Sequence, residues 1–566
     1  MTARVIAIGL DCGDAERVKE WISQGCLEGL RAVRAQGAWC QLEVTGHFRD
    51  EAVWTEVLCG CRADKTGFFS PFEFLEGTYD LQWKPVYDYQ EYPLFYDLDP
   101  TCNIAAFDVP HCSSIADRIS GIQVLSWGAH YPTFPRLSSP KGLWSELADT
   151  YGTHPAVELI NIGAGWWDET FVKTLFDALI EGASLRATIC RDLLRRDKWD
   201  LFFTVISETH EACHHFESPD HPCSPKREPR ARLPESPMLE LYQVLDRELF
   251  NRLAFDVDPH GYLAVFSITG STGTTLDLAN AVILPEFLYR LSFPGNGMFP
   301  DSKTADIDSG GCSKPAMGTW SAEMWRRRAD SRLAALFMNP FAAPIDYPQS
   351  KGRLSQENNI ISAFASKVLN GLRRRLACMI LGFEYGRHAW IPASWYKRHW
   401  PAMKAFALPS TEAGRIRFNV KGREPHGLIE PEHYDYACEE LISHLRELSD
   451  ARTGTPAVKD VIRWRRASHA AGRNVPDEDL TVVWNEVPFD AAESPKVGRI
   501  GPFPFCRLGS HNPGGFLIVS GPGIEPGSTL PSGDVIDLAP TILNLMGVQV
   551  PDYFDGKPLL AAMTDT

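Results

Sequence analysis

Four short apolar runs constrain the fold of this chain more than any other feature. They cover residues 5–10, 201–206, 263–266 and 516–519, and each is followed by a polar residue. Apolar runs of this length are typical of strands that are buried on both faces, as the strands of parallel sheets are. Helical stretches such as 182–195 lie between them. The pattern predicts an α/β fold in which helices flank a mostly parallel central sheet.

The length of the chain predicts a hydrophobic core together with an additional segment. A chain of 566 residues exceeds the size at which a single core stops growing, and 44% hydrophobic residues supply ample material for one. Residues 301–413 differ from the rest of the chain in composition, because they hold basic helical segments and few apolar runs. We expect an α/β core made of residues 1–300 and 414–566. The range 301–413 would be a helical insertion, acting either as a lid or as a solvated elaboration.

The net charge and the cysteine pattern limit the classes of binding partner and the cellular compartment that can be expected. A net charge of -16 argues against a general binder of nucleic acid or of anionic membranes, while a small anionic substrate can still bind in a local basic pocket. No apolar stretch reaches membrane-spanning length, and the amino end has the pattern of a strand rather than of a secretory signal. The fourteen cysteines show no framework spacing. We expect a cytoplasmic protein with reduced thiols, and leave open a homo-oligomer.

Polar residues follow three of the apolar runs. Asp11, Glu208 and Ser267 each stand at or just after the end of a predicted strand. Because ligands bind outside the carboxyl ends of parallel strands, the three residues are expected to share one site.

Three histidines add metal-binding chemistry to this edge. His210 and His214 are four residues apart, which places both imidazoles on one face if the segment is helical. With His511 from a distant segment they form a divalent-metal site of the zinc type. The alternative is that each histidine is a hydrogen-bonded structural residue.

Several motifs along the chain resemble those of one enzyme superfamily. They are the first strand with its aspartate (5–11), the late histidine and the strand after it (507–511 and 515–524), the closing helix and loop (537–543, Pro551, Asp555 and Gly556), and the segment 419–425. Together they resemble the alkaline phosphatase superfamily, in particular its type I phosphodiesterase and nucleotide pyrophosphatase branch. The resemblance implies two divalent metals that clamp the oxygens of an in-line displacement, with a Ser or Thr nucleophile between them.

The sequence departs from that pattern at the positions of the metal ligands. His210 stands where the superfamily usually has an aspartate, and imidazole is also a good zinc ligand. Ile268 and Thr269 stand where an Asp-His pair would hold the second metal. Of the usual ligands of that metal only Asp11 remains, so a conventional two-metal site is not expected.

The position of the nucleophile departs from the superfamily pattern too. The resemblance places the nucleophile shortly before the aromatic residue Trp54, and this position holds Asp50 rather than a residue with a hydroxyl. Asp50 or Glu51 would be a ligand or general base, or an acid favoured at a helix amino terminus. For Glu208 we favour a role as an outer partner that orients an imidazole, over a ligand or a polar strand end. Three basic residues are candidates for contact with an anionic substrate: Lys65, Arg423 and Arg507.

The sequence thus predicts a metal-dependent hydrolase or transferase that acts on a phosphate or sulfate ester, as phosphodiesterases do. Its metal, most simply zinc, would be bound by His210, His214 and His511, with Asp11 as a further ligand. One alternative is altered chemistry at iron or manganese in a biosynthetic pathway. The other is a non-catalytic descendant that keeps a metal.

Overall fold

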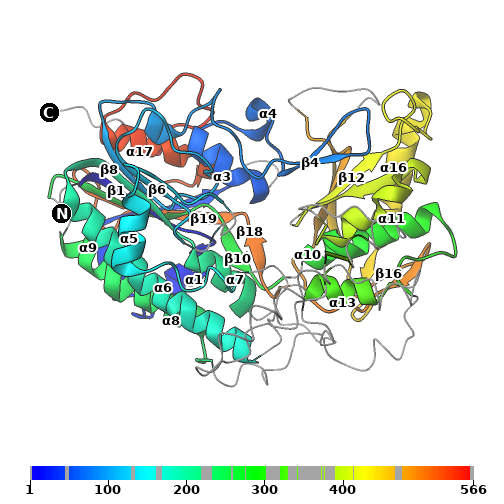
Figure 1. Ribbon diagram of the computed structural model, residues 1–566, viewed down its shortest axis with the longest axis horizontal. Coiled ribbons are helices and arrows are strands. Elements are labelled where there is room, and N and C mark those ends of the chain that lie inside the picture. Colours follow the sequence, from blue (N-terminus) through cyan, green and yellow to red (C-terminus); the bar gives the residue numbers. More distant parts are fainter. Residues whose placement is uncertain are drawn as a thin grey trace.

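Strand β1 (Ala3–Leu10), at the amino end of the chain, lies in the middle of a nine-stranded sheet. In the computed structural model this sheet forms one lobe, and a second lobe with its own sheet lies beside it (Figure 1). The described residues are 3–44, 50–128, 130, 134–160, 169–217, 233–256, 259–274, 276–300, 319–328, 341, 371–372, 375, 389–411, 413–465, 475–505 and 507–560. Within these residues no helix has the length and apolar character that crossing a membrane requires.

The large sheet has the strand order β20-β2-β19-β9-β1-β8-β5-β6-β7. Strand β1 pairs in parallel with β8 and β9, and β5 pairs in parallel with β8 and β6. The predicted α/β fold with a mostly parallel sheet is therefore confirmed. Besides β1, the strands are β2 (Gly37–Glu43), β5 (Asn103–Phe107), β6 (Ser120–Leu125), β7 (Leu137–Ser139), β8 (Trp199–Ile206), β9 (Tyr262–Ser267), β19 (Gly514–Ser520) and β20 (Gly533–Asp534).

One strand runs against the expectation. The apolar run 516–519 was expected to form a parallel strand, but β19 is antiparallel to both of its neighbours, β9 and β2. The reason is the direction from which the chain arrives. Strand β18 (Ser510–Asn512) pairs with β10 (Gly270–Thr272), which directly follows β9. The chain therefore enters β19 at the edge where β9 ends.

Helices cover both faces of the large sheet. Alternate residues of β1 belong to different hydrophobic clusters, Ile6 and Ile8 to one and Val5 and Ala7 to the other, as strand geometry requires. The first cluster includes α1 (Ala15–Ser23), α2 (Glu28–Gln36), α5 (Leu143–Tyr151), α6 (Glu169–Arg196), α7 (Glu208–Phe216), α8 (Pro237–Leu245) and α9 (Asn251–Asp256). The second includes α3 (Asp50–Cys59) and α17 (Leu538–Met546).

The second lobe has its own hydrophobic cluster and an antiparallel sheet of order β11-β12-β15-β14. Its elements are β11 (Ala405–Leu408), β12 (Gly414–Phe418), β14 (Val458–Arg463), β15 (Leu480–Trp484), α11 (Leu284–Ser292), α13 (Trp320–Arg326) and α16 (Tyr434–Arg446). Most of the predicted insertion 301–413 lies outside the described residues. Its described part holds α13 and β11, and β11 pairs with β12 beyond the predicted boundary. The boundaries stay a prediction.

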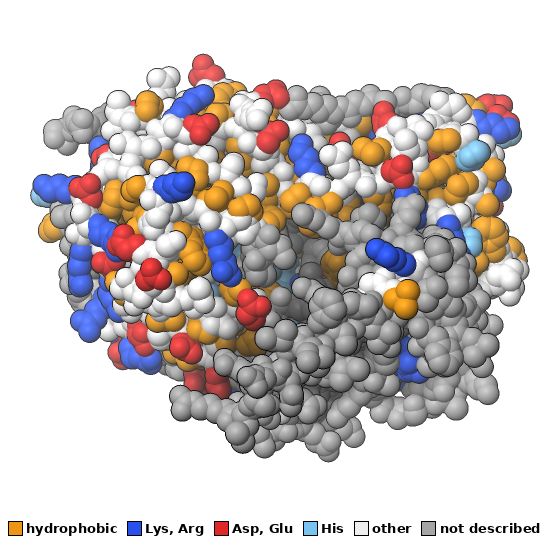
Figure 2. Space-filling model, in the orientation of Figure 1, with side chains coloured by type: hydrophobic (Ala, Val, Ile, Leu, Met, Phe, Trp, Pro, Cys, Tyr) orange, Lys and Arg blue, Asp and Glu red, His pale blue; other side chains and the backbone are white. Residues whose placement is uncertain are grey.

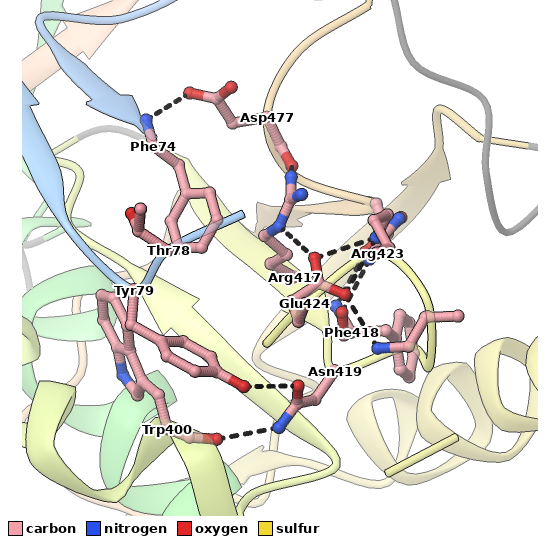
Figure 3. Close-up of polar contacts among 12 residues, drawn as sticks. Phe74, Thr78, Tyr79, Trp400, Arg417, Phe418, Asn419, Arg423, Glu424 and Asp477 are labelled. Carbon is pink, nitrogen blue, oxygen red and sulfur yellow. Dashed lines mark hydrogen bonds and ion pairs between the residues drawn. The ribbon is translucent and has the colours of Figure 1, made fainter. Parts of the chain in front are cut away.

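A hairpin from the amino-terminal half joins the second lobe. Strands β3 (Phe72–Phe74) and β4 (Leu81–Trp83) pair with each other, and their aromatic residues pack in the cluster of that lobe. Figure 3 shows the polar contacts: Tyr79 donates to Asn419 Oδ1 at 2.8 Å, and the Phe74 amide donates to Asp477 at 2.8 Å. Asn419 opens the motif 419–425, so that motif has a structural role here.

The face of the molecule seen in Figure 2 carries no large block of one charge. Basic and acidic side chains are interspersed over the lobe of the large sheet. The excess of acidic residues, -16 in net charge, is therefore not gathered into a patch on the described part of this face.

Candidate metal centre

Three elements bring the predicted ligands, and also Cys12, to one edge of the large sheet. Asp11 and Cys12 follow β1, while His210 and His214 lie one turn apart on α7, directly after β8. His511 lies in β18, just before the antiparallel strand β19. A residue before an antiparallel strand reaches the same edge as residues that follow parallel strands. The five side chains can therefore meet although they are separated by up to five hundred positions in the sequence.

The Nε2 atom of His214 lies close to the Nε2 atoms of the other two histidines. His214 Nε2 lies 3.2 Å from His210 Nε2 and 3.3 Å from His511 Nε2. His214 Nδ1 lies 3.0 Å from the carbonyl oxygen of Gly509. Because a carbonyl oxygen can only accept, Nδ1 carries the proton and Nε2 presents a lone pair to the other two rings.

The electrostatics keep His214 neutral. Burial lowers the pKa of His214 well below its usual value, and the charges of Arg507, His210 and His511 lower it further. A neutral imidazole is the form that binds metal ions. Hydrogen bonding of the remote nitrogen to a carbonyl is also the usual way to orient such a ligand.

The donor geometry fits a zinc-type ion. Zinc–nitrogen bonds of about 2.0–2.1 Å in a tetrahedral site hold two ligand nitrogens about 3.3–3.4 Å apart. The two measured separations, 3.2 and 3.3 Å, are close to that spacing. His210, His214 and His511 can therefore hold one divalent ion.

Asp11 is fixed beside this group. Trp54 Nε1 donates to Asp11 Oδ1 at 3.0 Å, and the hydroxyl of Thr209 donates to the Asp11 carbonyl at 2.6 Å. Its second carboxylate oxygen, Oδ2, lies 3.2 Å from His210 Nδ1. Burial opposes ionisation of Asp11, but the neighbouring imidazoles of His130 and His210 hold its pKa well below the usual range.

Sequence reasoning missed three donors. Cys12 Sγ lies 3.4 Å from His210 Nδ1, and Cys213 forms a possible metal-binding group with His214 and His511. Burial raises the pKa of the Cys213 thiol, but its contacts with Cys12 and His511 outweigh this and lower it to about 6. Both cysteines directly adjoin a predicted ligand in the sequence, which was the available signal.

The third missed donor, His130, comes from the loop after β6. Its Nε2 lies 2.5 Å from Asp11 Oδ2. Strand β6 is parallel to β5, which is parallel to β8, so the loop after β6 lies at the same edge of the sheet. His130 also forms a possible metal-binding group with Asp11 and His210.

The structure describes the side chains of Ile268 and Thr269, at the second departure from the superfamily pattern. Ile268 is fully buried in the hydrophobic cluster of α3 and α17. The Thr269 hydroxyl donates to Cys12 Sγ at 3.8 Å. Asp50 and Glu51 are the first two residues of α3, and their side chains lie outside the described part of the structure. Their roles as ligand or base stay predictions.

The contacts of the Glu208 carboxylate are with Arg186 and His154. Its carboxylate accepts from Arg186 Nε at 2.8 and 2.9 Å and lies 3.1 Å from His154 Nε2. Burial would raise its pKa, but the charge of Arg186 and the contact with His154 outweigh this and lower it to about 2. The imidazole that Glu208 contacts is therefore that of the buried His154.

A further carboxyl of α7 lies close to the candidate site. Glu211 is 7% exposed, and burial raises its pKa to about 7 although the charges of Arg507 and His130 act in the opposite direction. Nothing in its sequence context distinguished Glu211 from a surface glutamate.

The three basic candidates for substrate contact are bound to acids. Arg507 forms a two-pronged ion pair with Asp277 at 2.6 and 2.8 Å. Arg423 pairs in the same way with Asp479, both bonds being 2.7 Å, and lies in the second lobe (Figure 3). Lys65 pairs with Asp555 at 2.7 Å. All three candidates are therefore engaged in ion pairs with aspartates.

Comparison with known proteins gives structural likeness only. No protein-family model and no curated protein matches the chain. Phosphonoacetate hydrolase from Sinorhizobium meliloti 1021, in complex with phosphonoformate, is 12% identical with a TM-score of 0.43, and 96% of each chain is covered. Human ectonucleotide pyrophosphatase/phosphodiesterase 5 is 10% identical with a TM-score of 0.43, covering 98% of this chain and 97% of its own. The fold class stated above comes from the strand order itself.

Proposed function

We propose that this protein is a metal-dependent hydrolase or transferase of phosphate or sulfate esters, phosphodiesters being the substrate class that the sequence motifs imply. The observation that carries the proposal is that His214 Nε2 lies 3.2 Å from His210 Nε2 and 3.3 Å from His511 Nε2, with His214 Nδ1 tied to Gly509. Zinc is the simplest ion for this donor set. A bound divalent ion of this kind polarises a phosphoryl or sulfuryl oxygen and offsets its negative charge.

The chain's own residues define what surrounds that ion. The hydrogen bond from His214 to Gly509 fixes the imidazole, and Trp54 fixes the carboxylate of Asp11 beside it. His214 lies on α7 and Trp54 on α3, while Gly509 directly precedes β18, so two regular elements and one loop support the centre. Such support restricts the motion of the ligands, which catalysis at a metal requires.

The first experiment is elemental analysis of the purified protein, followed by hydrolysis assays with bis(p-nitrophenyl) phosphate and p-nitrophenyl sulfate. We expect zinc, and hydrolysis of at least one ester. The His214→Ala variant should lose the metal and reduce turnover by more than the roughly 100-fold that loss of an outer ligand partner costs.

The matched control is His215→Ala, which removes the adjacent imidazole of the same helix from outside the converging group. It should keep the metal. Iron in place of zinc would favour the altered metal chemistry, and a folded, metal-free and inactive wild-type protein would overturn the proposal.

A further inference from the structure

One donor group at the candidate metal centre includes a sulfur atom. The metal-capable atoms of Cys213, His214 and His511 lie within 4.8 Å of one another. All three residues are buried, whereas the other two such groups among the described residues each include a partly buried histidine. The most enclosed set of donors at this edge of the sheet is therefore a thiol with two imidazoles.

We propose that the thiolate of Cys213 is a ligand of the ion that His214 and His511 hold, so that the centre is a mixed sulfur–nitrogen site. The proposal rests on the proposed function for the ion itself. It names the sulfur of α7 as a ligand in place of the carboxylate of Asp11, and it determines which metals the centre takes.

The fold brings the three donors together although Cys213 and His214 are neighbours on a helix. Adjacent helical residues point about 100° apart, so an ion that both bind must lie over the turn between them. The segment before β18 lies against that turn. The amides of Leu508 and Gly509 donate to the His214 carbonyl, and a Cβ at Gly509 would lie 1.9 Å from the Cys213 carbonyl oxygen. The His511 ring stacks on that of His214, with centroids 4.9 Å apart.

Cys12 is the competing sulfur, because it forms a group of its own with His210 and His511. Its Sγ lies 3.4 Å from His210 Nδ1, and Asp11 Oδ2 lies 3.2 Å from the same nitrogen. The nitrogen of His210 that lies 3.2 Å from His214 Nε2 is instead Nε2. The two ring nitrogens are distinct and their lone pairs point in different directions, so an ion shared with His214 lies away from the edge that faces Cys12 and Asp11.

A set of four protein ligands suits the ion. Three imidazoles and one thiolate are donor types that zinc prefers in tetrahedral sites, and a catalytic zinc site can expand to five ligands. The thiolate contributes a negative charge, which the neutral imidazoles do not. A sulfur ligand selects zinc, cobalt and cadmium over magnesium and manganese. The centre should therefore reject the hard divalent ions that prefer oxygen ligands.

The test uses cobalt as a spectroscopic substitute for zinc. A thiolate bound to cobalt(II) absorbs in the near ultraviolet by charge transfer from sulfur to metal, and an imidazole or carboxylate ligand does not produce this band. Metal-free wild-type protein with one equivalent of cobalt should show the band, and Cys213→Ser should lose it. That variant should also bind zinc more weakly by at least about tenfold, the lower end of what loss of an outer ligand partner costs.

The matched control is Cys12→Ser, which replaces another fully buried cysteine at the same edge of the sheet. It should keep both the band and the zinc affinity.

Each result decides. Cobalt-bound wild type without the band overturns the sulfur ligand, and this measurement needs no variant to fold. A folded Cys213→Ser variant that keeps the band overturns it too, as does a folded Cys12→Ser variant that loses the band. If the wild type binds cobalt without the band and His214→Ala binds none, the sulfur ligand fails while the proposed function stands. If the wild type binds no metal, both fail.

Discussion

At the scale of single residues, hydrogen bonds and burial decide which atoms can do chemistry. His214 is available to a metal because Gly509 takes its Nδ1 proton and burial keeps the ring neutral. Arg507 and Arg423 are as basic as any substrate-binding arginine, yet each is occupied by an aspartate. Residue type alone therefore identified the histidines correctly as neighbours and could not reveal that these arginines were paired.

Glu56 on α3 provides a residue-scale prediction about pH. Burial raises its pKa from 4.5 to about 7, although its carboxylate accepts a hydrogen bond from the Ala63 amide. Between pH 4.5 and 7 the folded protein keeps a proton that the unfolded chain has released, so the free energy of unfolding falls as pH rises through this window. Above it, both states are ionised and the full cost of burying the charge is present.

Glu56→Gln removes that charge and keeps an acceptor for the Ala63 amide. At pH 8 the variant should be more stable than the wild type by about 1–3 kcal/mol. At pH 4, where the glutamate is protonated in both states, the advantage should vanish. Denaturant unfolding at the two pH values measures the difference, and the exposed Glu432→Gln is the control. An equal effect at both values would show that the side chain does not titrate as stated.

At the scale of elements, the direction of a strand decided what the sequence could reveal. The run 516–519 was correctly identified as a strand, but its direction depends on the partner strand, which the run does not specify. His511 nevertheless reaches the site because β19 is antiparallel. His130 was missed because the strand before it, β6, contains the polar residues Ser120 and Gln123 and lacks the continuous apolar pattern of the other four.

The same limit applies to the second lobe. Its strand β12 alternates apolar residues with Arg415 and Arg417, and these arginines are buried against Glu478 and Glu424. A short strand that contains buried arginines has no continuous apolar run to detect. The sequence therefore predicted the central sheet well and did not predict the second sheet.

The connection between α7 and β18 gives an element-scale prediction. The amides of Leu508 and Gly509 donate to the His214 carbonyl at 3.0 and 3.3 Å, and a Cβ added at Gly509 would lie 1.9 Å from the Cys213 carbonyl oxygen. Gly509→Ala must therefore displace the segment that carries His511. We expect at least a tenfold loss of metal affinity, the lower end of what disturbing a ligand's support costs.

Competition with a chromophoric chelator measures that affinity. The control is Gly371→Ala, whose added methyl group meets no atom of the described residues within 4 Å. Unchanged metal affinity in Gly509→Ala would mean that the close approach of the loop to α7 is not needed to place His511.

At the scale of the whole molecule, one hairpin connects the two lobes. Its sequence follows elements of the first lobe, but its side chains pack in the second lobe. Tyr79 lies between β3 and β4, its hydroxyl donates to Asn419 Oδ1 at 2.8 Å, and it accepts from the His426 amide at 3.3 Å. Its ring stacks on that of His426. The hairpin therefore links the folding of the second lobe to a segment that leaves the first lobe directly after α4 (Ala63–Thr66).

Tyr79→Phe tests this coupling, because it keeps the stacked ring and removes only the hydroxyl. Asn419 is fully buried, so its Oδ1 loses a hydrogen-bond donor that water cannot replace, at a cost of about 1–3 kcal/mol. The thermal unfolding midpoint should fall, while the zinc content, which depends on the other lobe, should not change. Tyr436→Phe, at a side chain that is 70% exposed, is the matched control. If Tyr79→Phe lowered the zinc content as well as the unfolding midpoint, the metal centre would depend on the second lobe. The separation of the lobes argued from their hydrophobic clusters would then be wrong.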